Sequence, residues 1–114
     1  MNTILNMKTL MQRVGDDKEI ANEILEMFID TIPELIDNLK AAISQGNSDL
    51  LIKTSHEIKG ISGNISAEKL AETAAQLESY GKKNDFDNCK EILPIFDKEF
   101  EELRVEIKQL LEGI

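Results

Sequence analysis

Apolar side chains recur at steps of three and four residues along most of this chain, and no stretch alternates as a β-strand requires. The two longest stripes of this kind lie in residues 20–43 and 86–110. They consist of Ile20, Ile24, Phe28, Ile32, Leu35, Leu39, Ala42 and Ile43, and of Phe86, Cys89, Leu93, Phe96, Phe100, Leu103, Ile107 and Leu110. Because this spacing places apolar groups on one face of a helix, the pattern predicts an all-α protein.

Glycines and polar residues divide the chain into expected helices. We expect a short helix over residues 4–14 before Gly15, and a second helix from Asp16-Asp17 to Gly46. A third helix is expected to start at residues 47–49 and to run through Ile65. The fourth is expected to be capped by Ser66 and stopped at Gly81, and the fifth to end at Gly113. Pro33 and Pro94 predict a kink or break inside the two longest helices. Short connections predict an up-and-down antiparallel four-helix bundle with a short additional N-terminal helix, forming one domain over residues 1–114.

The composition narrows the possible partners and compartment. The 13 basic and 22 acidic side chains give a net charge of −9, which argues against nucleic acid or an anionic membrane surface as the main partner. The single cysteine, Cys89, cannot form an internal disulfide, so we expect a reducing compartment. With no signal-peptide pattern and no apolar run of membrane-spanning length, a cytoplasmic protein is expected, and the starting Met favours a free-standing one. We expect Cys89, Met7, Met11 and Met27 to fill gaps in the core.

Gly60 and Gly63 depart from the rules that the rest of the sequence follows. Both lie within the expected third helix, where each costs ~1 kcal/mol relative to Ala. On a helical wheel, His56 lies opposite the expected core face, with Ile52 one turn before it as an exposed apolar contact. That core face consists of Leu51, Thr54, Ser55, Ile58, Ile61, Ser62 and Ile65. The only histidine of the chain is therefore expected to face solvent, with both glycines clearing the space around it.

This pattern favours a nucleophile that another protein approaches closely. Imidazole keeps a neutral, nucleophilic nitrogen at cellular pH and can carry a phosphoryl group covalently. Lys59 lies one turn after His56 and can offset the added negative charge. The leaving group and any metal would have to come from a partner. The chain has no set of metal ligands, no phosphate-loop spacing and no ATP-binding region, so autonomous catalysis is not expected.

The stretch SHEIKGISGNISAEKLAETAAQLE (residues 55–78) resembles the signature of histidine-containing phosphotransfer (HPt) domains. The resemblance implies that His56 is the phosphoacceptor through Nε2, with Lys59 as its positive neighbour. It also implies that Gly60 and Gly63 let a receiver domain approach, and that Glu78 accepts a hydrogen bond from the other imidazole nitrogen.

One position departs from the family pattern. Ten residues after the histidine the family usually has glycine, whereas this chain has Ser66. We expect this serine to cap the following helix and the turn to persist with altered backbone dihedrals.

The resemblance implies a phosphorelay intermediate of two-component signalling. Its expected partners are response-regulator receiver domains and a sensor or hybrid histidine kinase. It needs no cofactor of its own, since Mg²⁺ is expected on the receiver. Two alternatives remain open: a helical module that binds a receiver or kinase without exchanging phosphate, and an adaptor unrelated to phosphate that docks through its acidic surface or residues 4–14.

Overall fold

The computed structural model describes residues 5–112 of the chain, which form helices joined by short turns. The helices are α1 (Met7–Arg13), α2 (Lys18–Gln45), α3 (Ser48–Asn64), α4 (Glu68–Lys82) and α5 (Phe86–Glu112). No strand occurs within this part of the chain, so the predicted all-α class is confirmed. None of these helices is both long enough and apolar enough to span a bilayer.

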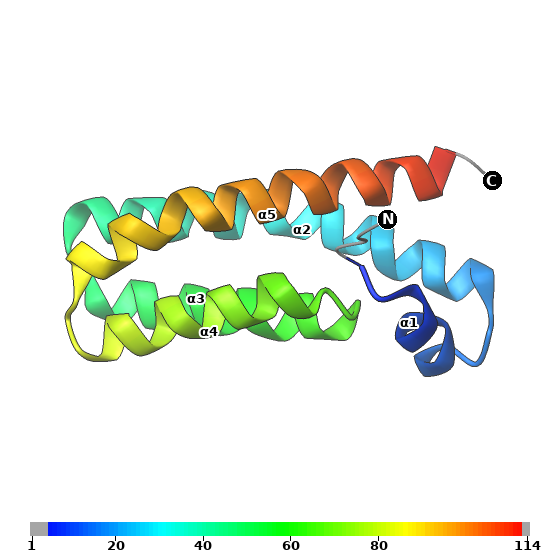
Figure 1. Cartoon of the computed structure of the whole chain (residues 1–114), viewed down its shortest axis with the longest axis horizontal. Coiled ribbons are helices and arrows are strands. Elements are labelled where there is room, and N and C mark those ends of the chain that lie inside the picture. Colours follow the sequence, from blue (N-terminus) through cyan, green and yellow to red (C-terminus); the bar gives the residue numbers. More distant parts are fainter. Residues whose placement is uncertain (1–4, 113–114) are drawn as a thin grey trace.

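The four longer helices pack as a closed bundle. Helix α2 contacts α3, α3 contacts α4, and α4 and α2 both contact α5. Figure 1 shows the long helices α2 and α5 side by side, and the shorter hairpin of α3 and α4 packed along part of their length. Helix α1 lies beside the end where α2 begins. Leu5 and Leu10 are fully buried, and the backbone N–H of Asn6 donates to the carbonyl of Ser66 at 3.1 Å. The predicted four-helix bundle with an additional N-terminal helix is thus confirmed.

The starts of α2 and α3 follow the capping residues that the sequence offers. The Asp17 carboxylate accepts hydrogen bonds from the backbone N–H groups of Glu19 and Ile20. Gly46 ends α2 with a φ of 66°, a left-handed conformation that glycine adopts without strain. Asn47 then caps α3 by accepting from the N–H of Leu50 at 3.1 Å.

Both predicted ends of the fourth helix are wrong. The N-cap of α4 is Ala67, which makes no side-chain capping bond, and not Ser66. Ser66 instead adopts a φ of 62°, so its backbone keeps a glycine-like conformation while its hydroxyl is buried without a partner. Gly81 does not stop α4, which ends one residue later at Lys82. The predicted outer ends at Ile4 and Gly113 lie outside the described residues.

The two prolines do not interrupt their helices. Pro33 lies inside α2 and Pro94 inside α5, and both helices are continuous, so of the predicted kink or break the break is wrong. Both prolines are exposed.

The core follows most of the predicted stripes, with two exceptions in α2. Ile20 is 44% exposed and Met27 is 67% exposed, so neither fills the core. The predicted apolar stripe of α2 therefore includes a residue, Ile20, that lies outside the buried face of this helix. Ala21, Leu25 and Ile36 are buried in the core, although the prediction omitted them. As predicted, Cys89 is fully buried and packs in the core, and Met7 and Met11 are half-buried against it.

Candidate functional site

The site begins with the exposed imidazole of His56 on α3. Its side chain is 65% exposed, whereas the opposite face of the same helix lies in the core. The buried residues of that face are Leu51, Thr54, Ser55, Ile58 and Ser62. The helical periodicity therefore placed His56 correctly, and an outside molecule can reach Nε2 of the ring.

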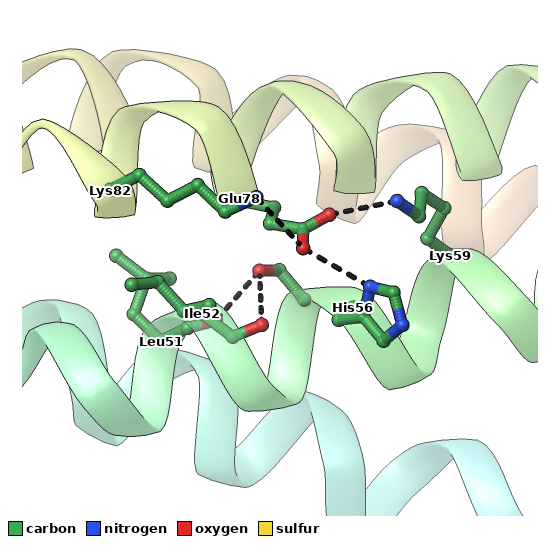
Figure 2. Close-up of polar contacts among 7 residues, drawn as sticks. Leu51, Ile52, His56, Lys59, Glu78 and Lys82 are labelled. Carbon is green, nitrogen blue, oxygen red and sulfur yellow. Dashed lines mark hydrogen bonds and ion pairs between the residues drawn. The ribbon is translucent and has the colours of Figure 1, made fainter.

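Glu78 of α4 lies beneath this imidazole and binds the surrounding cations. One carboxylate oxygen, Oε2, lies 3.1 Å from Nδ1 of His56. The other, Oε1, accepts a hydrogen bond from Nζ of Lys59 at 2.9 Å, and Nζ of Lys82 lies 3.7 Å from Oε2. Figure 2 shows the carboxylate reaching from α4 towards His56 and Lys59 of α3. The Glu78 side chain is only 9% exposed, so the carboxylate at the centre of this cluster is buried while the imidazole of His56 is exposed.

The electrostatics of the cluster keep Glu78 ionised. Burial raises the pKa of this carboxyl, but the hydrogen bond and charge of Lys59, the hydrogen bond from His56 and the charge of Lys82 together lower it below its ordinary value. An ionised carboxylate can only accept hydrogen bonds, so the shared proton of this contact lies on Nδ1 of His56. In a neutral imidazole only one nitrogen carries a proton, so this arrangement leaves the lone pair on Nε2, away from Glu78.

Lys82 belongs to the cluster although the sequence reasoning did not select it. Its position four residues after Glu78 places both side chains on one side of α4, and that spacing could have revealed it. Lys59 was selected, but its ammonium group is bound to Glu78. The predicted members His56, Lys59 and Glu78 are therefore brought together, with Lys82 as a fourth member.

The glycines near His56 leave open space, as the sequence predicted. A Cβ built on Gly60 or on Gly63 would have no heavy atom within 4 Å outside its own helix and chain neighbours. Because α3 ends at Asn64, Gly63 lies in its last turn, where glycine disturbs the helix least. Ile52 is half-buried and not fully exposed, since Gly81 of α4 lies against it.

An apolar groove adjoins this surface where α1, α2 and α3 meet. Its volume is about 580 Å³, and Met27 and Ile61 contribute to its walls. Its other lining residues are Arg13, Val14, Ile24, Phe28, Thr31, Asn64 and Ile65. The exposed Met27, which does not fill the core, thus borders a hollow at the C-terminal end of α3. Among residues 5–112, no three His, Cys, Asp or Glu side chains are grouped so that they could hold a metal ion.

Fold and site together define a small helical bundle that exposes one imidazole, oriented by a buried carboxylate. The family model for the Hpt domain matches residues 23–113, and the chain belongs to this family. The match includes α3, α4 and every residue of the His56 cluster.

Several known proteins are similar to this chain. It is 29% identical over 91 residues to the phosphorelay intermediate protein rdeA of Dictyostelium discoideum, covering 76% of this chain but only 34% of that protein. It is 23% identical over 105 residues to histidine-containing phosphotransfer protein 2 of rice, covering 90% of this chain and 70% of that one.

The fold also matches solved structures. Histidine-containing phosphotransfer protein B from Pseudomonas aeruginosa superposes with a TM-score of 0.90 at 23% identity, covering 100% of this chain and 99% of that chain. The HPT domain of a sensor hybrid histidine kinase from Shewanella gives a TM-score of 0.85 at 20% identity, with 97% and 96% covered.

Proposed function

We propose that this domain is a phosphorelay intermediate that carries a phosphoryl group on Nε2 of His56. The observation that carries the proposal is the contact between Nδ1 of His56 and the ionised Glu78, which in the neutral ring leaves the lone pair on Nε2 of an exposed side chain. Membership of the Hpt domain family and similarity to proteins named phosphorelay intermediates support it.

The chemistry requires only a phosphoryl donor, which we propose to be the aspartyl phosphate of a response-regulator receiver domain. The lone pair of Nε2 attacks phosphorus, the bond from phosphorus to the aspartyl oxygen breaks, and its electron pair leaves with the aspartate. Nδ1 keeps its proton throughout, so the ring becomes a phosphoimidazolium whose positive charge faces Glu78. Lys59 and Lys82, which bind the same carboxylate as His56, bring positive charge to the site that offsets the negative charge of the phosphoryl group. The reverse sequence passes the group to another receiver.

The partner supplies the remaining parts in this proposal. Mg²⁺ is held by the receiver, where it offsets the charge of the transferring phosphoryl group. A receiver approaches over Gly60 and Gly63, where nothing projects from α3, and beside Ile52. A sensor or hybrid histidine kinase feeds the relay in the cytoplasm. The domain itself has no kinase activity, in keeping with a sequence that lacks an ATP-binding region.

The test is transfer from a receiver domain that has been phosphorylated in the presence of Mg²⁺. We expect an acid-labile, base-stable label on the wild-type chain and none on His56→Ala, and ATP alone should label neither. Binding of the receiver without any label would favour the alternative of a non-catalytic interaction module. A label that persists in His56→Ala would place the phosphoryl group on another residue and refute the proposal.

A further inference from the structure

Helices α3 and α4 lie close together at Gly81, one turn away from the His56 cluster. Gly81 is buried, and a Cβ built on it would lie 3.0 Å from Cγ of Leu51 and 3.3 Å from Cγ1 of Ile52. Gly60 and Gly63 on α3 meet no such neighbour. Glycine at position 81 is therefore favoured by the closeness of α3, since a larger residue would displace its neighbours by a few tenths of an ångström, and not by an unusual backbone conformation.

The register of the antiparallel pair links this contact to the site. Glu78 precedes Gly81 by one turn of α4, and His56 follows Leu51 and Ile52 by about one turn of α3. The two contacts are thus successive layers of one helix pair. The hydroxyl of Ser48 also donates to the carbonyl of Gly81 at 2.8 Å, which holds α4 against the start of α3.

We propose that Gly81 is a positioning residue, since the helix separation that it permits keeps Glu78 within hydrogen-bonding distance of His56. An ordinary van der Waals contact of an added Cβ begins at 3.4 Å. The distance between this Cβ and Cγ of Leu51, which is 3.0 Å, would therefore have to lengthen by 0.4 Å. The same displacement at the next layer would stretch the 3.1 Å contact to 3.5 Å, the limit for a hydrogen bond. Leu51 is fully buried in the close-packed core, so the helices separate more readily than this side chain moves.

The test is Gly81→Ala, read by ¹⁵N NMR of the imidazole. His56 is the only histidine of the chain, so its two ring nitrogens give a single, assignable pair of signals. In the wild type we expect the tautomer protonated on Nδ1, and in Gly81→Ala a shift towards the tautomer protonated on Nε2. Alanine favours helix more than glycine does, by ~1 kcal/mol, and this gain offsets part of the packing cost and helps the variant to fold. Unchanged ring signals in the folded variant would overturn the inference.

Two further variants separate positioning from general destabilisation. Leu51→Ala in the Gly81→Ala background removes the two nearest atoms that the new Cβ meets, leaves only Cγ1 of Ile52 at 3.3 Å, and should restore the wild-type ring signals at least in large part. Failure of this rescue would contradict the steric explanation. Leu103→Ala, which opens a cavity in α5, should lower stability and leave the imidazole signals unchanged, whereas the same tautomer shift there would show a merely structural effect.

The consequence for transfer rests on the proposed function. With phosphoramidate as a small phosphoryl donor, Gly81→Ala should label roughly twofold to tenfold more slowly than wild type, which corresponds to losing one hydrogen bond. A normal rate combined with a shifted tautomer would refute the link to transfer. Absence of labelling in the wild type would refute the proposed function and leave the NMR test of Gly81 intact.

Discussion

Replacing Glu78 is the most informative perturbation of this domain, because one buried carboxylate contacts both the ring of His56 and two lysines. Glu78→Ala removes the acceptor for Nδ1 of His56 together with the partner of Lys59 and Lys82. Glu78→Gln keeps one acceptor oxygen at nearly the same place, removes the charge, and replaces the other acceptor oxygen with an NH2 donor. Comparing the two variants separates hydrogen bonding to the ring from electrostatics.

The expected loss of stability is small. The partners of Glu78 are 65%, 38% and 62% exposed, so water solvates them again once the carboxylate is removed. We therefore expect Glu78→Ala to lower the free energy of unfolding by about 1–2 kcal/mol, near the lower end of the range for hydrogen bonds to charged groups. A domain of this size commonly has ~5–15 kcal/mol of stability, so the bundle should remain folded.

The expected loss of function is larger. Without an acceptor at Nδ1, the ring populates the tautomer in which Nε2 carries the proton and cannot attack phosphorus. We expect Glu78→Ala to accept a phosphoryl group about tenfold more slowly than wild type, which corresponds to ~1.4 kcal/mol in the barrier. Glu78→Gln should lose about twofold to threefold, since a neutral hydrogen bond is weaker than a charge-assisted one.

The pH dependence of stability gives a second measure of the same carboxylate. The pKa of Glu78 is lowered in the folded state below its ordinary 4.5, so ionisation stabilises the fold above that value. The difference in unfolding free energy between wild type and Glu78→Gln should be constant from neutral pH down to about 5. It should then shrink as the pH falls through the folded pKa of Glu78. Urea denaturation of both proteins at each pH measures this difference.

Labelling rates from a phosphorylated receiver, with urea denaturation of the same samples, complete the test. Normal labelling of Glu78→Ala with a large loss of stability would show that Glu78 is a structural residue, and the reasoning about the tautomer would be refuted. Equal losses in Glu78→Ala and Glu78→Gln would show that a neutral amide cannot replace the carboxylate, and the twofold to threefold expectation for Glu78→Gln would be refuted.

Three further substitutions test other parts of the description. Gly60→Leu should leave the thermal unfolding curve within a few degrees of wild type. It should slow transfer from a receiver at least ~10-fold, because the leucine side chain enters the open space over α3. Transfer as fast as in the wild type would show that clearance there is unimportant. Ser66→Gly should raise the free energy of unfolding, measured by urea denaturation, by about 1 kcal/mol. It removes both a left-handed non-glycine residue and an unpartnered buried hydroxyl. A loss of stability would contradict this account of the turn. Asn47→Ala should lower the unfolding free energy by ~1 kcal/mol by removing the cap of α3, and an unchanged urea midpoint would show that the contact with Leu50 contributes nothing.

The sequence predicted the helices and the exposed histidine because both depend on local periodicity. Helical spacing alone places His56 opposite the core face of α3, and Asp17 and Gly46 mark helix ends through chemistry confined to their own turns. The contact between Glu78 and His56 was expected only from the family resemblance, since it joins two helices whose rotation about their axes no local pattern fixes.

Several of the wrong predictions concern places where contacts or turns between helices decided the outcome. Gly81 looked like a helix terminator, but glycine is favoured there because Leu51 approaches closely. Ser66 looked like a cap, but the turn that joins α3 to α4 requires a left-handed residue there. Met27 looked like a core residue, but α2 turns it away from the interior and towards the groove.

The members of the His56 cluster all come from the hairpin of α3 and α4, which are consecutive in the chain and joined by the short turn 65–67. The long flanking helices contribute no side chain to it among the contacts described. Surface changes on α1, on the first turns of α2 or along the outer side of α5 can therefore alter affinity for a visiting molecule while the reactive group keeps its surroundings. With this division, duplicated copies of the fold can diverge in their binding partners while the His56 cluster stays the same.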